Sequence, residues 1–131
     1  MRYGYWLPVF GGWLRNVDDE GMAASWEYVR HLAQRSEEIG YDITLIAELL
    51  LNDIKGINAP SLDAWSTAAA LAAVTSSIEL MVAVRPNFHQ PALFAKAAIP
   101  YCMRPLPARE RRSSMSAILG LMASTGSPCI T

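Results

Sequence analysis

Three short apolar runs, separated by longer helix-like stretches, constrain the fold of this chain most strongly. They span residues 3–10, 42–47 and 78–84. The first run is rich in aromatic residues and ends at a glycine pair, which is typical of a strand followed by a turn. The other two runs are nearly continuous rather than alternating, a pattern typical of parallel strands that are covered on both faces.

Helical patterns fill the intervals between these runs. Residues 25–39 place their apolar side chains on one face, and Gly40 follows as a helix stop that needs a left-handed backbone. A second helix is expected over 62–75, and a third begins at Pro91 and is interrupted by Pro100. This alternation predicts an α/β fold with right-handed βαβ units, a parallel sheet and helices outside it.

The composition of the chain changes near residue 100. Residues 1–100 carry seven Lys or Arg against eleven Asp or Glu, whereas residues 101–131 carry four arginines, one glutamate and both cysteines. The last thirty residues also show no clean strand or helix period. We therefore expect residues 99–131 to be a divergent segment that is poorly ordered or incompatible with the fold.

Charge and cysteine placement argue against several classes of function. The formal net charge of −1 provides no basic face for nucleic acid or for an anionic membrane. No apolar run is long enough to span a bilayer, and the N-terminal segment lacks a signal-peptide pattern, so a cytoplasmic location is expected. Cys102 and Cys129 have no metal-ligand spacing, which predicts free thiols and no metal site.

Three stretches of the first hundred residues carry motifs that occur together in one known family. They are YGYWLPVFGG in the first run, DAWSTAAALAAVT at 63–75 and IELMVAVRPNFHQPALFAKAA at 78–98. In their order and spacing they resemble the luciferase-like flavin-dependent monooxygenases, in particular the alkanesulfonate and dimethyl-sulfone monooxygenase branch. The resemblance covers residues 1–98 of the 131.

The resemblance implies a fold and a chemistry that the residue pattern alone does not establish. It implies that the chain is the N-terminal part of a (β/α)8 barrel of the TIM type, whose sites lie at the carboxyl ends of the strands. It further implies FMN supplied in reduced form by a partner flavin reductase, O2 as co-substrate and a small organosulfur substrate, either a sulfonate or a sulfone. For the full-length family it implies a homo-oligomer.

Beyond residue 98 the sequence departs from the family pattern. The family continues into an Asp-Arg-(Ile/Leu)-Ser-Asn-Gly-Arg turn, whereas this chain continues as IPYCMRPLPARERR. The abrupt change suggests a frameshifted or truncated reading frame, so we expect three βα units of an incomplete barrel that is inactive on its own. Two alternatives stay open: a genuine short protein that serves as a non-enzymatic α/β interaction module, and completion of the barrel by another chain.

Five residues near the ends of the expected strands are candidates for flavin binding under this resemblance, and no catalytic residue is assigned. Phe10 packs either on flavin or substrate or in the core. Glu48 is either a pocket carboxylate or a solvated one. Val82 and Ala83 either bring their backbone against the flavin ring or form a plain buried strand. Arg85 either meets an anionic ligand or pairs with Glu48.

Expected roles or positions also follow for one serine and for both histidines of the chain. Ser61 stands where the sulfonate enzymes can carry a cysteine, and it is expected to cap the second helix. His89 follows the third strand, where a proton-transfer role is one possibility. His31 is expected to face solvent. Because parallel strands share one carboxyl edge, we also expect Phe10, Glu48 and Arg85 to lie at the same end of the sheet.

Overall fold

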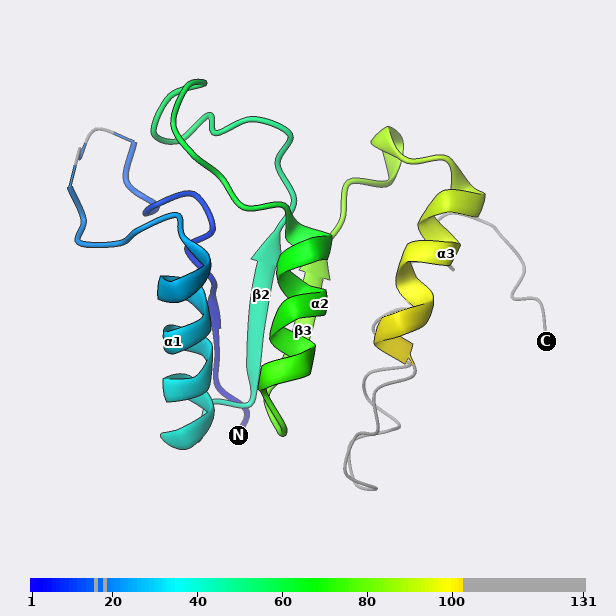
Figure 1. The fold of residues 1–131 in the computed structure, drawn as a ribbon, viewed down its shortest axis with the longest axis horizontal. Coiled ribbons are helices and arrows are strands. Elements are labelled where there is room, and N and C mark those ends of the chain that lie inside the picture. Colours follow the sequence, from blue (N-terminus) through cyan, green and yellow to red (C-terminus); the bar gives the residue numbers. More distant parts are fainter. Residues whose placement is uncertain (16, 18, 103–131) are drawn as a thin grey trace.

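The computed structural model describes residues 1–15, 17 and 19–102. They form a parallel sheet whose strands alternate with helices along the chain (Figure 1). The elements are β1 (Gly4–Trp6), α1 (Trp26–Glu38), β2 (Ile43–Ala47), α2 (Ala64–Val74), β3 (Glu79–Ala83), the 3-10 turn η1 (Pro86–Phe88) and α3 (Pro91–Cys102). The sheet order is β1-β2-β3, and both neighbouring pairs are parallel. The predicted α/β class and the three parallel strands are confirmed.

The sheet register decides which side chains face the helices. Trp6, Leu45 and Met81 lie beside one another across the three strands and therefore share a face. The opposite face carries Thr44 and Ile46, and α1 and α2 pack there, as Figure 1 shows. The sheet thus has one face covered by helices and one face that no described helix covers.

The core fills the space between the sheet and its two covering helices. It is a cluster of fully or nearly fully buried apolar side chains: Leu7, Val9, Phe10, Val29, Ala33, Ile46, Ala64, Ala68 and Leu71. Leu80 and Val82 of β3 pack against this cluster. On the open face, by contrast, Trp6 keeps 47% of its surface exposed. Apolar burial therefore stabilises the helix side of the sheet first.

Strand β1 is shorter than residues 3–10, the range expected from the sequence. The backbone N–H of Leu7 still donates to the carbonyl oxygen of Leu45 at 2.7 Å, but Pro8 has no N–H with which to continue the ladder. The chain then turns, and the N–H of Gly11 donates to the carbonyl oxygen of Pro8 at 3.3 Å. Residues 7–10 consequently leave the sheet and contribute three side chains to the core.

The helix ends confirm one prediction and correct two. Gly40 has a φ of +93°, and its N–H donates to the carbonyl oxygen of Glu37, so it ends α1 as expected. Asp63, not Ser61, caps α2, because its carboxylate accepts from the N–H of Ser66 at 2.7 Å. Helix α3 runs through Pro100 to Cys102 and is not interrupted there, although proline has no N–H to donate to the carbonyl oxygen of Lys96, four residues earlier.

Helix α3 crosses the expected boundary between residues 98 and 99 and runs on to Cys102. The expectations for residues 103–131, Cys129 included, lie outside the described residues. Within the described residues, no helix is both long enough and apolar enough to cross a membrane.

Candidate functional site

The loops that follow the three strands all leave the same edge of the sheet. They are residues 7–25, 48–63 and 84–90, and the first two rise above the carboxyl ends of the strands at the top of Figure 1. In parallel α/β folds this edge carries the ligand site, because the loops there can vary while the strands hold them in place. The polar contacts at this edge therefore define the candidate site.

Glu48, directly after β2, is the centre of these contacts. Only 7% of the residue is exposed, and its carboxylate accepts hydrogen bonds from three sides. Oε1 lies 3.0 Å from Nε1 of Trp65 and 2.7 Å from Nε2 of His89. Oε2 accepts from the backbone N–H of Arg85 at 2.8 Å, and the N–H of Glu48 itself donates to the carbonyl oxygen of Ala83 at 3.3 Å. A buried carboxylate needs such donors to offset its loss of hydration.

The Glu48 contacts join four elements of the fold. Trp65 belongs to α2, and His89 lies in the loop between β3 and α3. Both rings also contact Phe94 of α3: the Trp65 and Phe94 centroids are 5.8 Å apart at 80°, and the His89 and Phe94 centroids are 6.1 Å apart at 39°. One carboxylate thus fixes β2, α2, the β3–α3 loop and, through Phe94, the start of α3.

Arg85 contacts Glu48 through its main chain and not through its guanidinium. The bond is made by its backbone N–H, and the ionisable side chain that contacts Glu48 within the described residues is His89. The side-chain ion pair between Glu48 and Arg85 is therefore not formed. The Arg85 residue is exposed, and its guanidinium has no ion pair with any described residue. The structure brings Glu48 and Arg85 together, as predicted, and adds His89 to them.

Phe10 lies at the same edge, but its side chain points into the core. It is 1% exposed, and its ring packs edge-on against Trp13 with centroids 5.7 Å apart. Its carbonyl oxygen accepts from Nδ2 of Asn52 at 2.9 Å. Of the two interpretations of Phe10, core packing is the one that the described contacts match. Two aromatic side chains that sequence reasoning missed are exposed near this edge. They are Trp6, whose ring packs against Trp13 at 6.1 Å, and Phe88 in the loop after β3.

The two candidates in β3 lie on opposite faces of the sheet. Val82 is paired with Ile46, and its side chain packs against the core cluster. Ala83 is paired with Ala47, one residue further along, and therefore faces the side opposite to Val82. A ligand on the open face could meet the side chain of Ala83, whereas it could meet Val82 through the backbone alone.

Two loop residues that sequence reasoning missed hold the edge together. Asn52 is 1% exposed, and its Nδ2 donates to the carbonyl oxygens of Phe10 and Pro60 at 2.9 and 2.8 Å. Its Oδ1 accepts from the N–H groups of Ile54 and Lys55 at 3.2 and 2.9 Å. Every hydrogen-bonding atom of the amide group is engaged, so Asn52 fixes the loop after β2 against the loop after β1.

Lys55 makes a second connection between the same two loops. Its Nζ donates to the carbonyl oxygens of Leu14, at 3.0 Å, and of Val17, and to the carboxylate of Glu20. The hydrogen bond from Lys55 lowers the pKa of Glu20. The side chain of Lys55 is only 11% exposed. A lone Lys or Asn in a polar loop gives no sequence signal of this kind, because the partners that tie it to the loop after β1 are distant in the sequence and most of them are backbone atoms.

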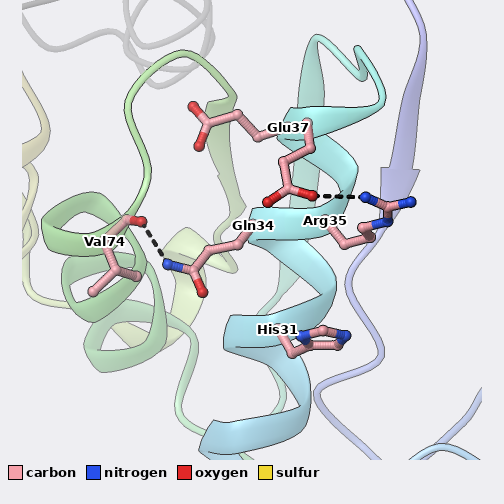
Figure 2. Close-up of a pocket in the computed structure, with 6 residues that line it drawn as sticks. His31, Gln34, Arg35, Glu37 and Val74 are labelled. Carbon is pink, nitrogen blue, oxygen red and sulfur yellow. Dashed lines mark hydrogen bonds and ion pairs between the residues drawn. The ribbon is translucent and has the colours of Figure 1, made fainter.

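A shallow depression lies between α1 and the end of α2 (Figure 2). It is lined by His31, Gln34, Arg35, Glu37, Glu38 and Val74. Its polar groups are largely engaged: Nε2 of Gln34 donates to the carbonyl oxygen of Val74 at 3.1 Å, and Arg35 pairs with Glu38 at 2.8 Å. His31 is exposed, as predicted. This depression lies on the helix surface, away from the carboxyl ends of the strands.

Comparison with known families identifies the family of the chain. A family model described as luciferase-like monooxygenase matches residues 1–99. Because the match covers 99 of the 131 residues, the chain belongs to the luciferase-like monooxygenase family. Members of this family are flavin-dependent and have the TIM-barrel fold, with which the three parallel βα units agree.

Proposed function

We propose that this luciferase-like chain supplies the N-terminal three βα units of an FMN-dependent monooxygenase that oxidises a small organosulfur compound, a sulfonate or a sulfone, with O2. The FMN would arrive reduced from a partner flavin reductase, and the complete enzyme would be a homo-oligomer. The observation that carries the proposal is the family match over a segment whose strand ends are tied together by the buried carboxylate of Glu48.

The residues at this edge suit a flat cofactor with one apolar face. Ala47 and Ala83 are neighbours across β2 and β3 on the open face, and their small side chains leave the backbone approachable. Trp6 adds an exposed aromatic surface to the same face. The exposed guanidinium of Arg85 can donate to an anionic group or to the electron-rich edge of a flavin. When bound, reduced flavin supplies the electrons for the reaction with O2.

We assign the remaining candidate residues supporting roles in flavin binding. Val82 would contribute its backbone, because its side chain packs in the core. Phe10 would back the loop after β1 from within the core. Glu48 would position Arg85 and the β3–α3 loop, since each of its carboxylate oxygens already accepts from a protein donor.

The first test is a titration with FMN, and in parallel with riboflavin, followed by two-dimensional NMR of the labelled chain. Perturbed resonances are expected at Trp6, Ala47, Ala83 and Arg85. The affinity should be weak and equal for the two flavins, because the phosphate-binding half of such a site comes from the last strands of a barrel. Ala83→Leu should abolish the perturbations, whereas Ala69→Leu at an exposed position of α2 should leave them unchanged. Perturbations confined to the α1–α2 depression would refute the proposed site.

The second test concerns activity of the isolated chain. Within the described residues β1 and β3 are open sheet edges, which a closed barrel would pair. We therefore expect no tight FMN binding and no turnover, measured as O2 consumption that depends on a sulfone or sulfonate in the presence of a flavin reductase. Micromolar FMN binding together with substrate-dependent turnover would show that the incomplete-barrel part of the proposal is wrong.

A further inference from the structure

The contact between His89 and Glu48 is set by hydrogen-bonding roles that leave little freedom. Nε1 of Trp65 can only donate, so Oε1 of Glu48, 3.0 Å away, is an acceptor. Nε2 of His89 lies 2.7 Å from the same oxygen. When the Glu48 carboxylate is ionised, it only accepts hydrogen bonds, so the proton in this contact is on Nε2 of His89.

This assignment determines the other nitrogen of the ring. A neutral imidazole with its proton on Nε2 carries a lone pair on Nδ1, which can accept a proton. Nδ1 of His89 has no hydrogen bond with any described residue. The side chain of His89 is 26% exposed, so part of the ring reaches the surface at the carboxyl edge of the sheet.

The ring is also held in place rather than free to rotate. Glu48 is itself fixed by Trp65 and by the backbone N–H of Arg85, at 3.0 and 2.8 Å. Phe94 packs against the His89 ring from α3. A carboxylate that orients a histidine and fixes its tautomer is the arrangement that makes imidazole an effective proton acceptor in enzymes. Among the described residues, the Glu48 carboxylate is the charged group in contact with the ring, and Arg85 belongs to the same loop.

We propose that His89 is a proton-transfer residue of the site at the carboxyl edge and that Glu48 is the positioning residue that holds it in the Nε2–H form. A proton passes from a bound substrate or a water molecule to Nδ1, the resulting imidazolium is paired with the Glu48 carboxylate, and the proton then returns to water. The inference rests on the proposed function only for the identity of the bound molecule.

The first test reads the tautomer directly on the chain itself. In long-range proton–nitrogen NMR spectra, recorded well above the ordinary histidine pKa of about 6.5, His89 should show one protonated and one unprotonated nitrogen. The exposed His31 should show the averaged pattern of two exchanging tautomers and is the internal control. Glu48→Ala should give His89 the averaged pattern. An averaged pattern in the unaltered chain, or a proton on Nδ1, would overturn the proposal.

The conservative variant keeps the test decisive if Glu48→Ala does not fold. Glu48→Gln, with its amide oxygen at the Oε1 position, still accepts from Trp65 and His89 and loses only the bond from the N–H of Arg85, so the Nε2–H tautomer should persist. Diethyl pyrocarbonate, which attacks an unprotonated imidazole nitrogen, should modify His89 at Nδ1, as detected by peptide mass spectrometry. If His89 stays unmodified while His31 reacts, the lone pair on Nδ1 is inaccessible and the proton-transfer role is refuted. The hydrogen bond between His89 and Glu48 would then have a structural role alone.

His89→Gln provides the remaining readout on the chain itself. The new side chain can still donate to Glu48 but cannot accept a proton, so diethyl pyrocarbonate should no longer modify position 89. The NMR and modification experiments contain no flavin, so failure of FMN to bind would refute the proposed function without affecting them.

Discussion

Replacement of Asn52 by alanine tests whether the two loops above the sheet are held by this one amide. The side chain is 1% exposed and makes four hydrogen bonds, donated to Phe10 and Pro60 and accepted from Ile54 and Lys55. Each buried bond contributes about 1 kcal/mol, and the backbone groups left without a partner cost somewhat more. We therefore expect Asn52→Ala to lower the free energy of unfolding by about 4 kcal/mol, a large part of the ~5–15 kcal/mol typical of a domain.

Asn52→Asp sharpens the test because it keeps the shape and changes one atom. The new oxygen would face the carbonyl oxygens of Phe10 and Pro60, at the 2.9 and 2.8 Å now spanned by donated hydrogen bonds. Repulsion and burial disfavour the ionised carboxylate, so its folded-state pKa should lie above the unfolded value of about 3.9. The loss of stability should then be largest at neutral pH and shrink as the pH falls through the folded-state pKa.

The assay is urea unfolding of each variant, followed by tryptophan fluorescence at neutral and at acidic pH. Asn58→Asp is the matched control, since Asn58 is exposed in the same loop, and it should change stability by no more than about 0.5 kcal/mol. A loss below about 1 kcal/mol for Asn52→Ala, or no pH dependence for Asn52→Asp, would show that the four bonds do not fix the loops.

Three further substitutions test other parts of the fold, each by its unfolding free energy. Burial alone would raise the pKa of Glu37, but hydrogen bonds from residues 76–78 lower it below 4.5. The loss of unfolding free energy in Glu37→Gln should therefore be greatest above that pH and vanish as the pH falls. Gly4→Ala should cost about 1–3 kcal/mol, because the new methyl group collides with Ile43. Tyr5→Phe should be neutral or slightly stabilising, because the buried hydroxyl makes no well-formed hydrogen bond within the described residues and has lost its hydration.

The sequence was sufficient for the elements and their direction because these follow from local patterns. Apolar runs that take turns along the chain with helical patterns predicted all three strands. Gly40 predicted the end of α1, because glycine readily adopts the positive φ found there. The face of each β3 residue was not predictable in the same way. The run 78–84 is almost continuously apolar, so its pattern does not separate Val82 from Ala83, and the register with β2 decides it.

The site was harder to predict because its contacts use backbone atoms and distant loops. Glu48 and Arg85 were correctly expected at one edge, but the sequence suggested opposite charges in contact, whereas the bond is made by an N–H that every residue but proline has. Lone residues such as Asn52 have no pattern, since their partners are fixed by tertiary structure. The position of His89 was predictable, because a histidine that follows a parallel strand lies at the carboxyl edge of the sheet, where sites form.

The enclosed ammonium group of Lys55 has a consequence for chemical labelling. Three acceptors surround its Nζ, and the side chain is nearly buried, whereas Lys96 on α3 is exposed. These two are the only lysines in the sequence. An amine-reactive reagent applied to the folded chain should therefore acylate Lys96 rapidly and Lys55 slowly. The ratio of the two modified peptides becomes a measure of how often the loops after β1 and β2 separate, without any change to the sequence.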